Sequence, residues 1–267
     1  MQLIDHYAPE WITETQAMVE GWLAEEPRSY VYLLLDASFK HETTLTWVRE
    51  NWPEGNWRSL YQDAPNTSER VLAISPLLLL VDKDSLGALE AIAKETSGQP
   101  MLSLVVSTET LDLLWERLAA FRIVTVQDAR YVLRLTDARR LSQIAEMLSK
   151  EQRALLMSHM TAWCYIGRDA RWRELALGGV TTAEPDDMSS IRLDDRQTQI
   201  LLDMNRIDAL IDGLRRHESE LHDLFDSPSR RHEWVVKTLD SASLSAADYP
   251  EQVQCCRSAA HREGWLT

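Results

Sequence analysis

The sequence predicts an α/β N-terminal lobe, with a mixed sheet and flanking helices, followed by an all-α C-terminal lobe. In the N-terminal part, short apolar runs bounded by turn residues alternate with segments of helical periodicity. From Asp137 onward the chain becomes mainly helical, and residues 178–187 are rich in turn-forming residues without apolar periodicity. We therefore place the α/β lobe at residues 1–177, a linker at 178–193 and the helical lobe at 194–267.

The first elements of the α/β lobe follow from this periodicity. Pro9 suits the first turn of a helix, and apolar residues then recur at helical spacing until Pro27. Residues 30–36 form a short continuous apolar run, which is typical of a strand buried on both faces. The other elements expected before residue 122 are helices at 44–51, 86–95 and 108–121, strands at 57–61 and 101–107, and an apolar segment at 71–81 that Pro76 interrupts.

A hairpin and further helices complete the predicted lobe. Strands at 122–127 and 131–135 flank polar residues at 127–130 that suit a turn. Helices are expected at 137–149 and 151–160, and a strand at 171–177.

One long apolar stripe dominates the predicted helical lobe. Apolar residues recur at helical spacing between Ile200 and Phe225, which predicts a single helix of six or seven turns. The segments 234–239 and 250–262 can cover this stripe and would form a lobe of three or four helices. A partner helix could take part of the stripe instead, but cover within the chain favours a core role.

Charge and composition exclude several classes of protein. The chain has 267 residues, 45% of them hydrophobic, with 28 Lys and Arg against 42 Asp and Glu and a net charge of -14. Such a chain can bury a core, and its charge disfavours nucleic acid and membrane surfaces as partners. By region the net charge is -8 over 1–69, 0 over 70–185 and -6 over 186–267.

Cysteine content and the N-terminus indicate the compartment. The three cysteines, Cys164, Cys255 and Cys256, cannot all pair within the chain, which fits a reducing environment. Residues 1–11 lack the positive start of a secretory signal, and no apolar stretch approaches the roughly 20 residues of a membrane helix. We expect a soluble cytoplasmic protein.

Arginines concentrate between residues 117 and 140, where the acidic residues are Asp128 and Asp137. These arginines are Arg117, Arg122, Arg130, Arg134, Arg139 and Arg140. They could form a basic patch, but pairing with the acidic ends of the same molecule is the favoured interpretation.

No familiar catalytic or metal-binding constellation is found in the sequence. The nine glycines form neither a dinucleotide-binding motif nor a phosphate-binding loop, and no nucleophile elbow is present. His217 and His222 are five residues apart, whereas helical zinc pairs use three or four. Cys255 and Cys256 fit an apolar position within a helix. We therefore expect a protein that is not an enzyme and holds neither cofactor nor metal.

The segment from Arg134 to Leu141 is the most informative local pattern. It lies at a change from strand to helix, where Asp137 can cap the new helix. If its role is structural, we expect a buried or half-buried Arg134–Asp137 pair that fixes this corner.

Three ordered blocks of sequence resemble a known family. The blocks are Tyr32-Leu-Leu-Leu-Asp-Ala37, Ser75-Pro-Leu-Leu-Leu79 and Leu133-Arg-Leu-Thr-Asp-Ala-Arg139. Their order and spacing resemble the effector adaptor chaperones of bacterial type VI secretion, the domain-of-unknown-function 4123 family. Arg134, Asp137 and Arg139 match the third family block, while Leu135, Thr136 and Ala138 replace its two aromatics and its proline.

The resemblance covers about residues 29–165 and carries expectations about function. It implies an α/β lobe followed by a helical lobe, no catalysis, and a role in holding a toxic effector and delivering it to the VgrG spike. The spike contact would involve a C-terminal extension of VgrG or a PAAR-type tip. Arg134, Asp137 and Arg139 are the expected partner-binding residues of the blocks, and Asp36 and Pro76 are expected to be structural.

Tryptophan content agrees with a binding role. The chain has ten tryptophans, a residue that is enriched among interface anchors. Trp47, Trp52 and Trp57 recur every five residues in a polar segment, so we expect at least one to be exposed and to bind a partner. Core packing is still the favoured role for any single tryptophan.

Two other functions are open at this point. The chain could be an enzyme with an unrecognised site in a cleft between the lobes, where Asp36, Arg134 and Asp137 would converge. It could also be an acidic inhibitor of a basic protein, whose binding would collapse in added salt.

Overall fold

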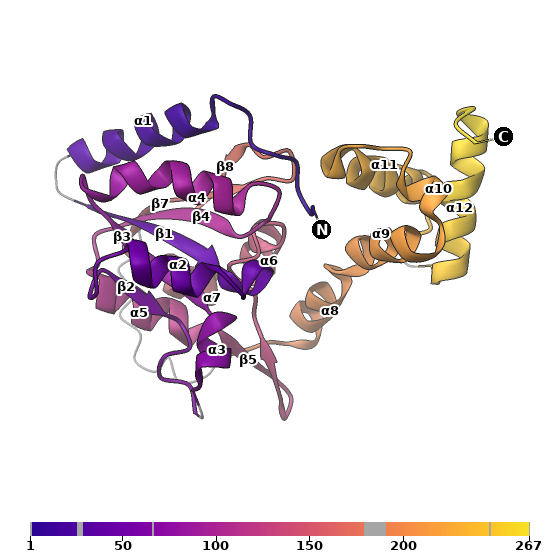
Figure 1. Ribbon diagram of the computed structural model, residues 1–267. Coiled ribbons are helices and arrows are strands. Elements are labelled where there is room, and N and C mark those ends of the chain that lie inside the picture. Colours follow the sequence, from indigo (N-terminus) through magenta and orange to yellow (C-terminus); the bar gives the residue numbers. More distant parts are fainter. Residues whose placement is uncertain (1, 26–28, 66, 179–190, 246, 267) are drawn as a thin grey trace.

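A computed structural model describes residues 2–25, 29–65, 67–178, 191–245 and 247–266, which form two lobes (Figure 1). The helices of the first lobe are α1 (Trp11–Ala24), η1 (Ala37–Lys40), α2 (Thr44–Asn51), α3 (Glu69–Ala73), η2 (Ser85–Ala88), α4 (Leu89–Thr96), α5 (Leu111–Ala120), α6 (Leu141–Met147) and α7 (Lys150–Met157). Its strands are β1 (Tyr30–Asp36), β2 (Trp57–Ser59), β3 (Pro76–Val81), β4 (Leu102–Ser107), β5 (Ile123–Val126), β6 (Ala129–Val132), β7 (Met160–Ile166), β8 (Trp172–Glu174) and β9 (Ile191–Arg192). The later helices are α8 (Asp195–Asp203), α9 (Arg206–His217), α10 (Ser219–His222), α11 (Pro228–Ser241) and α12 (Tyr249–Arg262).

A six-stranded sheet forms the centre of the first lobe. Its order is β2-β3-β1-β4-β7-β8, and every neighbouring pair is antiparallel. Leu33 of β1 lies opposite Leu79 on one side and Leu104 on the other. A second sheet has the order β6-β5-β9, in which β5 pairs antiparallel with β6 and parallel with β9.

Helices cover both faces of the large sheet. Alternate residues of β1, such as Leu33 and Leu35, pack with α1, α2 and α4, whereas Tyr32 and Leu34 pack with α5, α6 and α7. In Figure 1, α1 and α4 lie on one side of the sheet and α5 and α7 on the other. This sandwich explains why β1 is an uninterrupted apolar run, because both of its faces are withdrawn from water. The predicted α/β lobe with flanking helices and the helical C-terminal region are confirmed.

Strand β7 was not expected from the sequence. The helix predicted at 151–160 ends at Met157, and Met160 begins β7, which pairs with β4 near the middle of the sheet. His159 adopts a left-handed conformation with φ of 62°, which turns the chain between the two elements. Met160–Ile166 is mostly apolar, and periodicity alone does not separate such a run from the end of a buried helix.

The long helix predicted from Ile200 to Phe225 is wrong, because the chain breaks into α8, α9 and α10. Ile200, Leu201 and Met204 pack against the core beneath α5, α6 and α7. Leu210, Leu214, Leu221 and Phe225 belong instead to a separate core with α11 and α12. These two groups of apolar side chains pack into cores that lie in different places, and one straight helix could not reach both. The chain therefore breaks after α8.

The second core is formed by α9, α10, α11 and α12, and the expected cover by the last two helices is confirmed. Gly213 of α9 lies against the ring of Tyr249 at the start of α12, where a Cβ atom would come within 2.5 Å of the ring. This close approach explains a glycine in the middle of a helix, a position where it usually costs stability.

The predicted linker at 178–193 lies mostly outside the described residues. Its end is described: Ile191 and Arg192 form β9 and pair with Val124 and Thr125 of β5. Helix α8, which the sequence placed in the helical lobe, packs on the α/β lobe through Ile200, Leu201 and Met204.

The described residues include no helix that is long and apolar enough to cross a bilayer. Cys164, Cys255 and Cys256 are free, and burial raises the pKa of Cys164 to about 11 and that of Cys256 to about 12. Cys255 and Cys256 lie within α12, as expected.

Candidate functional site

The corner at the end of β1 is a hydrogen-bonded network around Asp36. This carboxylate is 3% exposed and accepts hydrogen bonds from Arg134 Nη2 at 3.1 Å and from Thr136 Oγ1 at 2.9 Å. Its other oxygen accepts from the amide and the hydroxyl of Ser38. Pro76 lies opposite Asp36 in the sheet register and begins β3. With both of its oxygens engaged, Asp36 orders the corner, and it could act as a base only by giving up a bond.

A small cavity, the corner cavity, opens beside this network. It has a volume of about 240 Å³. Its lining includes Asp36, Ser38, Pro76, Arg134 and Thr136, together with Leu60, Tyr61, Ile74, Leu118, Arg122, Val132, Leu133 and Leu135. Two of its apolar members, Ile74 and Val132, are 44% and 52% exposed. Exposed apolar side chains next to a cationic side chain form a surface suited to protein contacts.

The residues of the third sequence block contribute to two different sites, the corner at Asp36 and a second site around Asp137. Arg134 faces the corner cavity, whereas Arg139 binds Asp137 in a bidentate manner, with distances of 3.0 and 2.8 Å. The expected Arg134–Asp137 pair is therefore wrong. Arg134 pairs with Asp36, and Asp137 pairs with Arg139 in its own loop. Asp137 also accepts a hydrogen bond from the amide of Arg139, ahead of α6. The guanidinium groups of Arg134 and Arg139 lie 4.9 and 5.7 Å from the ring centre of Phe39, which links the two sites.

Asp208 of α9 joins the two lobes through three arginines. Arg168, from the loop after β7, binds it with both terminal nitrogens, at 3.0 and 2.9 Å. Arg140 donates a hydrogen bond to the same carboxylate, and Arg139 lies 3.7 Å from it. Burial alone would raise the pKa of Asp208, but hydrogen bonds from Arg168 and the charges of the arginines hold it below its usual value. This junction pairs cations of the α/β lobe with an anion of the helical lobe.

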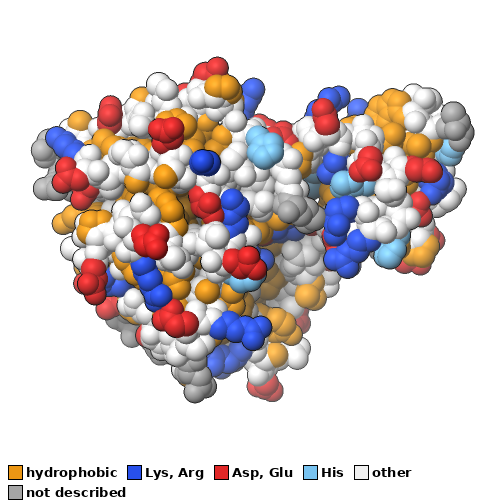
Figure 2. Space-filling view, viewed as in Figure 1, with side chains coloured by type: hydrophobic (Ala, Val, Ile, Leu, Met, Phe, Trp, Pro, Cys, Tyr) orange, Lys and Arg blue, Asp and Glu red, His pale blue; other side chains and the backbone are white. Residues whose placement is uncertain are grey.

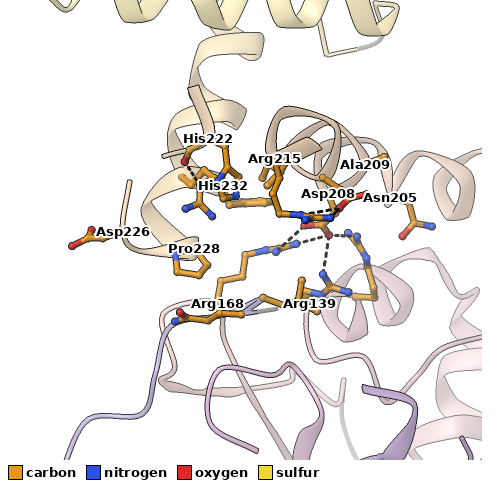
Figure 3. A pocket seen from close by; sticks show the side chains of 16 residues that line it. Arg139, Arg168, Asn205, Asp208, Ala209, Arg215, His222, Asp226, Pro228 and His232 are labelled. Carbon is orange, nitrogen blue, oxygen red and sulfur yellow. Dashed lines mark hydrogen bonds and ion pairs between the residues drawn. The ribbon is translucent and has the colours of Figure 1, made fainter. Parts of the chain in front are cut away.

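A larger cavity, the inter-lobe cavity, surrounds this junction (Figure 3). Its volume is about 500 Å³. Its charged and titratable lining consists of Arg139, Arg140, Arg168, Arg215, Arg231, Asp208, Asp212, Asp226, His222 and His232. Figure 2 shows the hollow between the lobes, with Lys and Arg side chains gathered on the part of the helical lobe that faces it. Burial, and next the charge of Arg168, lower the pKa of His232 to about 4.

Pairing within the molecule accounts for most of the arginines between residues 117 and 140. Arg122, Arg134 and Arg140 pair with the acidic end regions, as the sequence favours. Arg117 and Arg139 pair mainly with carboxylates of the middle region instead. Arg122 binds Asp63, and Arg117 forms a buried pair with Glu109. Arg134, Arg139 and Arg140 pair as described above, with carboxylates at Asp36, Asp137 and Asp208.

The three regularly spaced tryptophans are not exposed, contrary to expectation. Trp52 is 3% exposed, and its Nε1 donates to the carbonyl of Leu80 at 3.0 Å. Trp47 and Trp57 are half-buried against the core beneath α1, α2 and α4. None of the three lines the corner cavity or the inter-lobe cavity. The three tryptophans are spread over the end of a helix and the following strand, so their polar neighbours in the sequence do not make the tryptophan side chains exposed.

In the part of the chain that the structure describes, no group of three or more His, Cys, Asp or Glu side chains is arranged to hold a metal ion. The side chains that line the two cavities offer guanidinium groups, carboxylates, imidazoles, hydroxyls and apolar walls.

Comparison with protein families identifies the first lobe. Residues 31–155 match the model of the family described as domain of unknown function (DUF4123). The chain carries a DUF4123 domain. This is the family that the three sequence blocks resemble, so the expected family is confirmed. Comparisons with curated proteins and with solved structures gave no match.

The DUF4123 domain contains the whole corner and half of the lobe junction. Asp36, Arg134 and Arg139 lie within residues 31–155, whereas Arg168 and Asp208 lie beyond them. Residues of the domain and residues beyond it therefore form the arginine-rich wall of the inter-lobe cavity together.

Several residues of the two sites escaped sequence reasoning. Arg168, Asp208 and His232 come together from a loop and two helices, and no local motif marks them. Thr136 stood out in the sequence only as a departure from the family pattern, yet it binds Asp36. In the sequence, Asp208 is one of several acidic residues that lie between the apolar positions of the stripe, so nothing local sets it apart.

Proposed function

We propose that this protein is a non-enzymatic adaptor that binds a type VI secretion effector in the cytoplasm and loads it onto the VgrG spike. The DUF4123 domain at residues 31–155 carries the proposal, because effector adaptor chaperones are the proteins that its sequence blocks resemble. The spike is engaged through a C-terminal extension of VgrG or a PAAR-type tip.

The corner cavity supports a docking role. Ile74 and Val132 expose apolar surface at a cavity whose polar end is held by Arg134 and Asp36. An apolar side chain of the partner fits against Ile74 and Val132, while Arg134, 45% exposed, is available to a polar group of the partner. The rigid hydrogen bonds around Asp36 hold this arrangement before binding, which lowers the entropic cost of association.

The test is co-purification of the full-length chain with the effector and the VgrG protein encoded beside it. We expect a stable complex with the effector and capture of VgrG in its presence. Recovery of neither partner at micromolar concentrations would contradict the adaptor function.

A second measurement locates the interface. The double substitution Ile74→Asp and Val132→Asp should weaken effector or spike binding at least tenfold, because it places two charges against an apolar contact. Leu202→Asp is the matched control, since Leu202 is 60% exposed on α8 and lies outside the corner cavity. Equal binding by the double variant and the control would remove the corner cavity from the interface.

A further inference from the structure

We propose that the inter-lobe cavity binds an oxyanion, a carboxylate or phosphate group, through its arginines. Five arginines line it against three aspartates, and Asp137 lies behind Arg139 as a fourth carboxylate. The lining itself thus holds more arginines than aspartates, in a chain whose net charge is -14. The proposal does not depend on the adaptor function.

Arg231 is held differently from the other arginines of the cavity. The residue is 9% exposed, and its hydrogen bonds go to the backbone carbonyls of His222 and Phe225. Among the described residues no carboxylate lies within ion-pair distance of it. The carboxylates that act on it, Asp223, Asp226 and Asp5, lie beyond that distance, and burial lowers the pKa of Arg231. An anion in the cavity would therefore stabilise its charge.

Arg140, another arginine of the cavity lining, has one donor without a partner among the described residues. It is 7% exposed, and its two terminal nitrogens donate to the carbonyl of Met204 and to Asp208. Its Nε atom is buried and has no hydrogen-bond partner in the described structure. Buried donors are nearly always paired in folded proteins, so the hydrogen bonds to Met204 and Asp208 leave this guanidinium only partly satisfied.

The environment of His232 agrees with an anion. This side chain faces Arg139, Arg140 and Arg168 as well as Asp208, and its pKa of about 4 leaves it uncharged at neutral pH. Burial is the main cause of this low pKa and the charge of Arg168 lowers it further, so an anion bound in the cavity would raise it. A neutral imidazole can still donate one hydrogen bond to an oxyanion.

Size and donor geometry define the class of ligand. A cavity of about 500 Å³ lies within the range of sites for small molecules. Planar guanidinium groups match the paired oxygens of carboxylates and phosphates. The same group can come from a free anion or from an acidic segment of a protein, and two probes distinguish these sources.

The experiment titrates the full-length protein with inorganic phosphate and, separately, with a capped tetraglutamate peptide at constant ionic strength in chloride. We expect saturable binding at one site with a dissociation constant of about 1 mM or lower, and a rise in the pKa of His232 measured by NMR. Tighter binding of phosphate identifies a free anion as the source, and tighter binding of the peptide identifies an acidic segment. Non-saturable titrations with both probes would overturn the proposal.

Two variants of α9 make the test specific. Arg215→Gln removes a cavity arginine that is 41% exposed, and Arg216→Gln removes an arginine that is 60% exposed and outside this cavity. Both arginines pair with Asp212, so the helix loses a comparable interaction in each case. Arg215→Gln should weaken binding about tenfold and Arg216→Gln should leave it unchanged. An equal effect of both variants would mean that the probes sense overall charge, and would refute the site.

Discussion

Two aspartates on the same helix show how differently a carboxylate can act. Asp208 and Asp212 are one turn apart on α9, and each binds more than one arginine. The partners of Asp212 lie on its own helix, Arg215 and Arg216, and are largely exposed. The partners of Asp208 lie on the other lobe and are at most 17% exposed. Burial strengthens the second set of interactions and joins separate parts of the fold.

Asp208→Asn should lower the free energy of unfolding by about 3 kcal/mol, because it leaves buried guanidinium groups without their counter-charge. Asp212→Asn should change it by less than about 1 kcal/mol, since its pairs are screened by water. Urea denaturation of both variants measures the difference. Similar losses for the two would show that the junction around Asp208 contributes no more than an exposed ion pair.

The depressed pKa of His232 predicts a pH dependence of stability. Its value of about 4 lies below the ordinary 6.5, so between these pH values the unfolded chain binds a proton that the folded chain does not. Stability should therefore fall from pH 6.5 toward pH 4, by up to about 3 kcal/mol from this group. His232→Gln should lose less stability over the same range in thermal denaturation. Parallel curves for wild type and variant would assign the pH dependence to other groups.

At the scale of elements, two capping boxes are joined to each other. Ser149 and Gln152 cap α7, and Asp194 and Gln197 cap α8. Gln197 also donates to the carbonyl of Met147 at 3.0 Å and to the side chain of Gln152 at 2.7 Å. The start of α8 is thereby fixed to the α/β lobe, which explains why this helix packs there.

Gln197→Ala should destabilise the protein by about 1–2 kcal/mol, because it removes half of a capping box and leaves a buried carbonyl unpaired. Gln199→Ala is the matched control, since Gln199 is an exposed residue of the same helix that bonds only Asp203. Chemical denaturation should separate the two, and equal stability of both variants would contradict the proposed link between the caps.

At the scale of the whole molecule, the N-terminal segment ties the lobes together (Figure 1). The amide of Asp5 donates to the carbonyl of Arg168 at 2.8 Å. Its carboxylate accepts hydrogen bonds from the hydroxyls of Ser227 and Ser229 and from the amide of Ser229. These bonds fall at the first turn of α11, where an anion is favoured by the helix dipole.

Asp5→Ala should therefore cost about 1–3 kcal/mol and increase hydrogen exchange at the amide of Ser229. Glu10→Ala, an exposed change nearby, should alter neither. Unchanged exchange at Ser229 in the Asp5 variant would show that the N-terminal segment does not hold the helical lobe.

The sequence predictions are correct where local patterns decide the structure, and they fail where contacts between distant residues decide it. Segment periodicity identified β1, α1 and the two last helices, because burial on a fixed face leaves a local pattern. Periodicity missed β7, because a buried strand and the end of a buried helix have similar apolar runs. It also missed the break near Asn205, because an apolar stripe does not show which core its residues face. At the sites, the third block pointed to Arg134 and Asp137, but the sequence paired these two residues with each other.

The fold class, the family block with Arg134, Asp137 and Arg139, and the excess of acidic residues follow from the sequence alone, because each depends on local order or on composition. Three features could be known only from the folded chain: Arg134 binds Asp36, the spaced tryptophans are buried or half-buried, and Asp208 binds arginines of the other lobe. These contacts join residues far apart in the chain, and their partners are set by how the sheet, the helices and the two cores pack.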